Sequence, residues 1–96
     1  MSVRNTGAKG RRNEHRSMRL LESMGYTCHR MAGSKGEWDF IALGPIDVVL
    51  VQVKSNAWPG SVEMERLRLF VAPRNARKLV HRWRDRTRLP DVREVA

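Results

Sequence analysis

Apolar side chains recur along the chain with helical spacing in some segments and with the character of strands in others. Between residues 11 and 24 they follow helical spacing, with Met18 and Leu21 on one stripe, and Gly25 comes next as a suitable helix end. Residues 1–10 are basic, contain glycine and have few apolar positions. The pattern therefore predicts a flexible basic N-terminal arm followed by an amphipathic helix.

Three segments with strand character follow the helix. They are Tyr26–Met31, Trp38–Leu43 and Val48–Ser55. The last segment is almost unbroken in its apolar residues, which is typical of a central strand covered on both faces by helices. Turn-forming residues at positions 44–47 separate it from the strand before it.

The second half of the chain starts with another helical segment. Ser61 can cap a helix from residue 62 to about residue 71, whose first turn holds two glutamates that the helix dipole favours. Residues 76–84 fit either a helix or a strand, and Val92–Val95 reads as a short final strand. The order of elements and the length of 96 residues predict one α/β domain over residues 11–96.

The charge of the chain indicates a polyanionic partner. There are 19 Lys and Arg against 10 Asp and Glu, a net charge of +9, which favours nucleic acid first and an anionic membrane surface second. A solvated basic surface is the alternative. No apolar run approaches the ~20 residues that cross a bilayer, and the basic start is not a signal peptide, so we expect an intracellular protein. The one cysteine, Cys28, excludes an internal disulfide and a cysteine-based zinc site, and we expect it in the core.

The register of the second and third strands predicts a polar cluster. If Leu43 faces Val48 across the turn, the antiparallel pairing continues until Asp39 faces Gln52. Lys54, two positions further on, projects from the same face. Polar groups in such apolar strands are costly unless they are paired or bound to a metal. The alternative is an ordinary ion pair between Asp39 and Lys54 at the end of the sheet, with Gln52 bonded to a loop.

Glu14 adds a second carboxylate to this cluster. It precedes Met18 by four residues and Leu21 by seven, so it shares the buried face of the first helix, unless it lies near enough to the helix start to reach solvent. When the helix packs on the sheet, Glu14 can approach Asp39 and Gln52. Two carboxylates and an amide oxygen suit Mg²⁺ or Mn²⁺, and a neighbouring lysine can orient water for attack on a phosphate.

Short motifs in the first 55 residues resemble the archaeal-type Holliday junction resolvases of the PD-(D/E)XK nuclease superfamily. The matching pieces are Lys9-Gly10-Arg11-Arg12-Asn13-Glu14, Met24-Gly25-Tyr26, residues 30–34, Trp38-Asp39-Phe40-Ile41-Ala42 and Gln52-Val53-Lys54. Their order and spacing together are fairly specific. The resemblance implies a restriction endonuclease-like fold, in which helices flank a central mixed sheet, and a homodimer that cuts four-way DNA junctions with Mg²⁺ or Mn²⁺.

The same resemblance implies roles for individual residues. The catalytic positions are Glu14, Ser34, Asp39, Gln52 and Lys54. The metal ligands are Glu14, Asp39, Gln52 and the backbone carbonyl of Val53. The expected DNA contacts are Arg4, Lys9, Arg11, Arg12 and Lys35. The alternative for Ser34 is an ordinary turn residue, and for each basic residue a solvated surface charge.

One position departs from the family's pattern. The family usually has an acidic residue where this chain has Gln52. Three outcomes are open: Gln52 ligates through its carbonyl oxygen, which we favour, Glu37 or another acid compensates, or the protein binds DNA without cutting it. The alternatives to a junction resolvase are therefore a nuclease of the same superfamily that acts on other branched or duplex DNA, and an inactive DNA-binding module.

Overall fold

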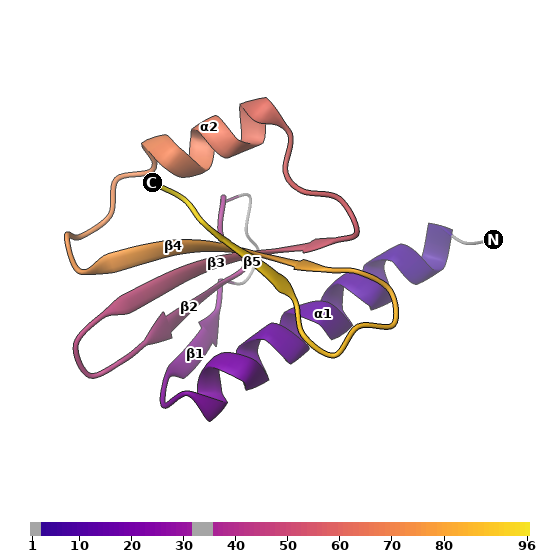
Figure 1. Cartoon of the computed structure of the whole chain (residues 1–96), viewed down its shortest axis with the longest axis horizontal. Coiled ribbons are helices and arrows are strands. Elements are labelled where there is room, and N and C mark those ends of the chain that lie inside the picture. Colours follow the sequence, from indigo (N-terminus) through magenta and orange to yellow (C-terminus); the bar gives the residue numbers. More distant parts are fainter. Residues whose placement is uncertain (1–2, 32–35) are drawn as a thin grey trace.

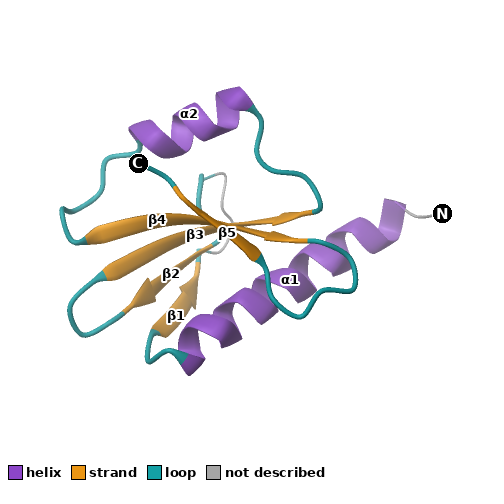
Figure 2. Cartoon of the chain, viewed as in Figure 1, coloured by secondary structure: helices purple, strands orange, loops and turns teal. Residues whose placement is uncertain are grey.

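In the protein, one sheet lies between two helices. The structure is a computed structural model, which describes residues 3–31 and 36–96, with side chains from residue 7 onwards. The elements are α1 (Val3–Ser23), β1 (Thr27–Arg30), β2 (Phe40–Leu43), β3 (Val48–Ser55), α2 (Ser61–Leu69), β4 (Ala76–Trp83) and β5 (Asp91–Glu94). The two helices lie on opposite faces of the sheet (Figures 1 and 2). No helix in this part of the chain is long and apolar enough to cross a membrane.

The described strands form one mixed sheet in the order β1-β2-β3-β4-β5. All neighbouring strands are antiparallel except β3 and β4, which run parallel. Parallel neighbours need a crossover connection, and α2 supplies it. Within residues 76–84, which fitted either a helix or a strand, the chain forms the strand β4. The predicted α/β fold, with helices flanking a central mixed sheet, is confirmed.

Strand β3 is buried on both faces, as its apolar run predicted. Val49 and Val51 pack toward α1, where they meet Leu21. Leu50 lies on the opposite face, in a second core cluster with Leu67 of α2. Because side chains alternate along a strand, the even-numbered positions that follow, including Gln52 and Lys54, project from the α2 face.

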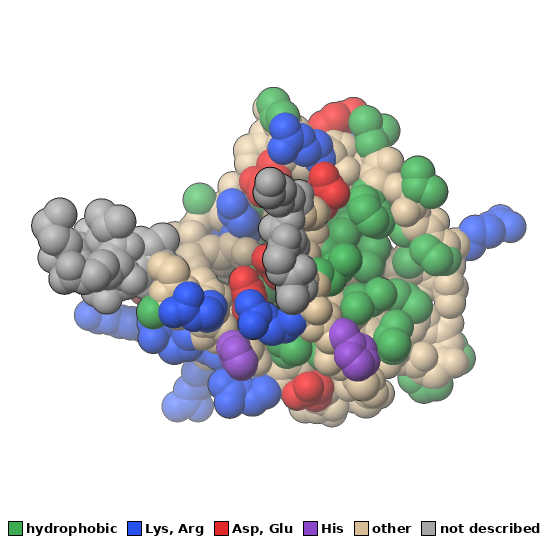
Figure 3. All heavy atoms as spheres, turned by 180° about the vertical axis from the view of Figure 1, so that it is seen from behind, with side chains coloured by type: hydrophobic (Ala, Val, Ile, Leu, Met, Phe, Trp, Pro, Cys, Tyr) green, Lys and Arg blue, Asp and Glu red, His purple; other side chains and the backbone are tan. Residues whose placement is uncertain are grey.

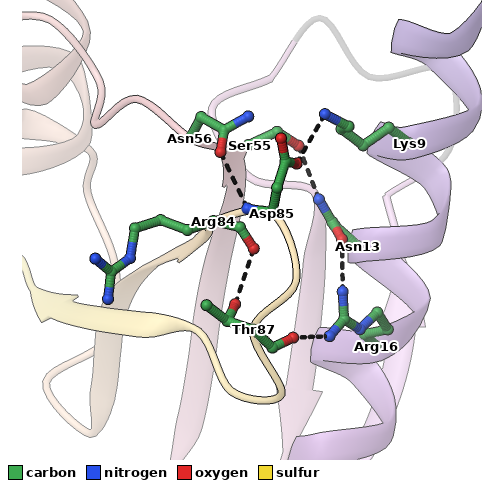
Figure 4. A network of polar contacts seen from close by, with 8 residues as sticks. All are labelled: Lys9, Asn13, Arg16, Ser55, Asn56, Arg84, Asp85 and Thr87. Atoms are coloured by element: carbon green, nitrogen blue, oxygen red, sulfur yellow. Dashed lines mark hydrogen bonds and ion pairs between the residues drawn. The ribbon is translucent and has the colours of Figure 1, made fainter.

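Helix α1 begins earlier than the sequence predicted. It starts at Val3 instead of about Arg11, so the expectation of a flexible arm is wrong for residues 3–10, which are helical. A tertiary contact holds the added turns, because Lys9 Nζ lies 2.9 Å from an Asp85 carboxylate oxygen, and in the next turn Asn13 donates a 2.8 Å hydrogen bond to Ser55 Oγ (Figure 4). These contacts outweigh the low helix propensity of glycine.

The helix ends match the predictions in part. Gly25 has a φ of 97°, and the hydrogen bonds Gly25 N–H to Glu22 O and Tyr26 N–H to Leu21 O form the expected glycine cap of α1. Helix α2 has Gly60 at its N-cap with no side-chain cap, so the predicted capping role of Ser61 is wrong. It also ends at Leu69, two residues short of the prediction.

Candidate active site

Asp39 is fixed by backbone hydrogen bonds at the point where the chain enters β2. Its N–H donates to Val51 O at 2.8 Å, and its carbonyl oxygen accepts from Met31 N–H at 3.0 Å. Its carboxylate oxygen Oδ2 accepts from Val53 N–H at 2.7 Å. The carboxylate is thus held against the backbone of β3 at Val53, whose carbonyl oxygen was a predicted metal ligand.

The predicted strand register is confirmed from Leu43, which pairs with Val48, to Phe40, which pairs with Val51. It does not extend to Asp39, whose N–H donates to Val51 O, so the predicted pairing of Asp39 with Gln52 is not formed. The alternative is borne out in part: among the described residues the ammonium of Lys54 pairs with Glu63 Oε1 of α2, at 3.5 Å, and not with Asp39, but Gln52 does bond to a loop, at Glu37 O.

The orientation of the Gln52 amide follows from its hydrogen bonds. Its Nε2 donates to the backbone oxygen of Glu37 at 3.1 Å and to Glu63 Oε2 at 3.0 Å. Both partners only accept, so the nitrogen must face them. Gln52 Oε1 is buried and has no hydrogen-bond partner among the residues that the structure describes. A buried oxygen of this kind is open to a donor or a cation.

Glu14 lies on the partly buried face of α1, as predicted. It pairs with Arg30 at 3.5 Å, and its side chain is 21% exposed. Burial and the negative charge of Asp39 raise the pKa of Glu14, which Arg30 offsets in part. Burial also raises the pKa of Asp39, and the charge of Glu63 adds to that rise. A bound cation would favour the charged form of each acid.

The acids are not drawn together into a closed metal centre. Within residues 3–31 and 36–96, no three His, Cys, Asp or Glu side chains are grouped so as to hold a metal ion. The predicted ligand set contains only two acids, Glu14 and Asp39, together with two neutral oxygens from Gln52 and Val53. The unpaired Gln52 Oε1 and the desolvated Asp39 carboxylate fit a hard cation at this place.

The residues predicted to contact DNA differ in solvent exposure. Arg11 and Arg12 are exposed on α1, whereas Lys9 is partly buried and pairs with Asp85. Lys and Arg side chains gather at the end of the molecule that carries the first half of α1 (Figure 3). The Arg4 side chain, Ser34 and Lys35 lie outside the described residues. The catalytic and DNA-binding roles of all these residues stay predictions.

The sequence reasoning missed Glu63 and Arg30 as members of the site. A signal for Glu63 was present, since Leu67 was expected in the buried stripe of the second helix and Glu63 precedes it by four residues. Glu65, two residues after Glu63, falls on another face and, among the described residues, pairs with Arg68 on the same helix. Arg30 begins one of the matching pieces, residues 30–34, but its contact with Glu14 could not be predicted from the sequence.

The class of fold that these elements define is restriction endonuclease-like. Among solved structures, the chain is similar to Hjc, a Holliday junction resolvase from the archaeal hyperthermophile Archaeoglobus fulgidus. The TM-score is 0.73, over 90% of this chain and 77% of that chain, at 21% sequence identity. No family model and no curated protein matches the chain. The resemblance seen in the motifs is therefore confirmed at the level of the fold.

Proposed function

We propose that the protein is a metal-dependent endonuclease that resolves four-way DNA junctions by symmetric phosphodiester hydrolysis inside the cell. The observation that carries the proposal is the Asp39 carboxylate bound to the N–H of Val53, the residue between Gln52 and Lys54, in a chain that shares the fold of a junction resolvase. Glu14 of α1 lies near enough to Asp39 for its pKa to respond to the charge of Asp39. The net charge of +9 suits a DNA partner.

The residues have distinct proposed roles. Asp39, Glu14, Gln52 Oε1 and the carbonyl of Val53 would hold Mg²⁺ or Mn²⁺. When bound, the metal supplies a Lewis acid for the scissile phosphate and an activated water. Lys54, with its side chain 32% exposed, can reach solvent to orient the attacking water and to offset charge on the phosphate. Arg11 and Arg12 would contact the DNA backbone.

A homodimer is part of the proposal. Two active sites related by a two-fold axis can cut two strands of a junction symmetrically. On the α1 face, an apolar groove between α1 and the β4–β5 pair is lined by Leu20, Met24, Leu79 and Val92. Met24 and Val92 are exposed there. Such a groove suits burial against a second copy in a chain whose own core is small.

Cleavage of a labelled four-way junction tests the proposed activity. The purified protein should make paired symmetric cuts with Mg²⁺ and none with EDTA, and linear duplex of the same sequence should be a poor substrate. Asp39→Asn and Lys54→Ala should each lower the cleavage rate by at least about 100-fold and leave junction binding within a few-fold, because they remove groups used in chemistry.

The same assay separates the alternatives. Equal cutting of junctions and linear duplex would indicate a nuclease of the superfamily with another substrate. Tight junction binding with no cleavage in Mg²⁺ or Mn²⁺ would indicate a DNA-binding module and refute the proposed activity. Cleavage by Lys54→Ala at the parent rate would show that the active site has been placed on the wrong residues.

A further inference from the structure

We infer that Glu63 of α2 supplies the acidic group that β3 lacks at position 52, and that Gln52 positions it. This inference rests on the proposed metal-dependent activity. Two contacts carry it: Gln52 Nε2 donates to Glu63 Oε2 at 3.0 Å, and Lys54 Nζ lies 3.5 Å from Glu63 Oε1. The carboxylate of Glu63 therefore lies directly beside the side chain at position 52.

The neutral amide of Gln52 is what allows the carboxylate to lie there. A carboxylate at position 52 would face the Glu63 carboxylate and the Glu37 carbonyl, both of which are acceptors, at about hydrogen-bonding distance. The NH₂ group of Gln52 instead donates one hydrogen to each acceptor. Gln52 is only 8% exposed, so the contact is sheltered from solvent. Its own Oε1 remains without a partner among the described residues and is available as a second oxygen beside the Glu63 carboxylate.

The fold explains why the acid comes from α2. The helix crosses the face of the sheet from which Gln52 and Lys54 project, and Leu67 anchors it in that core. Glu63 lies one helical turn before Leu67 and is thereby directed toward β3. Its side chain is 37% exposed and long, so it has room to adjust toward Asp39, whose pKa already responds to its charge.

Binding of Mn²⁺ to the metal-free protein, measured by calorimetry, tests the inference without any cleavage assay. Glu63→Gln should weaken Mn²⁺ binding by about 10-fold or more. Glu65→Gln is the matched control on the same helical turn, and it should bind like the parent. Adding Gln52→Glu to Glu63→Gln should restore affinity to within a few-fold of the parent, because the acid then returns to the strand. Thermal unfolding followed by circular dichroism checks that each variant folds. If Glu63→Gln does not fold, Glu63→Asp keeps the charge, shortens its reach and should still bind Mn²⁺ more weakly.

A cycle with Lys54→Ala distinguishes a direct role from an effect transmitted through Lys54. If Glu63 only balances the lysine, Glu63→Gln should leave Mn²⁺ affinity unchanged once Lys54 is removed. We expect the 10-fold loss to persist in that background. Parent-like Mn²⁺ binding by Glu63→Gln, or no loss in the Lys54→Ala background, would overturn the inference and leave the proposed function standing. A parent protein that binds no Mn²⁺ would overturn both.

Discussion

At the scale of single residues, His81 is a buried base held without charge. It lies on β4 with only 2% of its surface exposed, and its Nδ1 is 2.9 Å from Ser17 Oγ of α1. The same hydroxyl oxygen accepts a 2.7 Å hydrogen bond from the Trp83 indole. Burial lowers the pKa of His81 to about 4. Its role is therefore structural, since it is buried and its Nδ1 is engaged with Ser17.

This histidine should make the fold sensitive to acid. Because the folded pKa of His81 lies below its unfolded value of 6.5, the unfolded chain takes up the proton first as the pH falls. The stabilising effect is full above pH 6.5 and declines toward pH 4. Between pH 7 and pH 5, His81 should remove about 2 kcal/mol from the free energy of unfolding. Urea unfolding at the two pH values measures this loss.

A comparison of variants isolates the contribution of His81. Glu14 and Asp39 have raised pKa values and act in the opposite sense, since protonation favours their folded forms. His81→Phe keeps a ring in the core and cannot titrate, so its unfolding free energy should fall by about 2 kcal/mol less than that of the parent over the same pH interval. His29→Gln, at an exposed position, is the control. An identical pH response in the parent and His81→Phe would contradict the assignment.

At the scale of secondary structure elements, α1 connects the candidate active site to the candidate DNA surface. Its buried face carries Glu14 and Ser17, and its exposed face carries Arg11 and Arg12. Hydrogen bonds hold the first half of α1 to Ser55 at the end of β3, and to Asp85 and Thr87, which follow β4 (Figure 4). A rigid helix thus places both sets of side chains at once, which a flexible arm could not do.

Arginine substitutions on α1 should weaken DNA binding without changing its substrate preference. Arg11→Ala combined with Arg12→Ala should lower junction affinity by about 10-fold or more at moderate salt. It should also reduce the slope of log affinity against log salt by about 1 to 2, because phosphate contacts are lost. Fluorescence anisotropy at several salt concentrations measures both quantities.

Arg74 provides a matched control for this experiment. It is exposed and lies just before the start of β4. The first residue of β4 pairs with Val48, which lies at the opposite end of β3 from Lys54. Arg74→Ala should leave the salt slope unchanged. An equal effect of Arg74→Ala would mean that binding depends on net charge alone and not on α1.

The elements differ in how well the sequence predicted them, for physical reasons. Strand β3 was placed correctly because its apolar run is bounded by turn residues on both sides. Its partner register was correct because a tight turn sets the pairing of β2 and β3. The segment that forms β4 has apolar positions compatible with both periods, and only its pairing with β3 decides for a strand.

The parts that sequence reasoning missed depend on contacts between distant segments. The early start of α1 relies on the ion pair of Lys9 with Asp85, 76 residues away. The bond between Gln52 and Glu63 depends on how α2 crosses the sheet. The sequence could therefore bring Asp39 close to β3 and to Glu14, but it could not identify the acid that lies beside Gln52.

At the scale of the whole molecule, helix α1 covers only part of its face of the sheet. Helix α1 packs over β1, β2 and β3, and the apolar groove beside it extends over β4 and β5. The groove is bordered by an ion pair between Arg77 and Glu94. An apolar centre with a charged rim is the usual anatomy of a protein interface. This partial cover is the structural support for the proposed homodimer.

A charge placed in the groove should therefore separate the subunits. Sedimentation equilibrium should give the parent about twice the 11.1 kDa chain mass at micromolar concentration. Val92→Glu should give the mass of a single chain, because an unpaired carboxylate would be buried in the interface. Val62→Glu, at an exposed position on α2 on the opposite face, should leave the dimer intact.

The state of assembly should also change how a junction is cut. A monomer that retains Asp39 and Lys54 still has one active site, but it lacks the two-fold partner that would cut the opposing strand. Val92→Glu should thus convert paired cuts into single nicks while circular dichroism shows a folded protein. If the parent sedimented as a monomer and yet made paired cuts, the second incision would have to come from an independent binding event, and symmetric resolution would not depend on a dimer formed in advance.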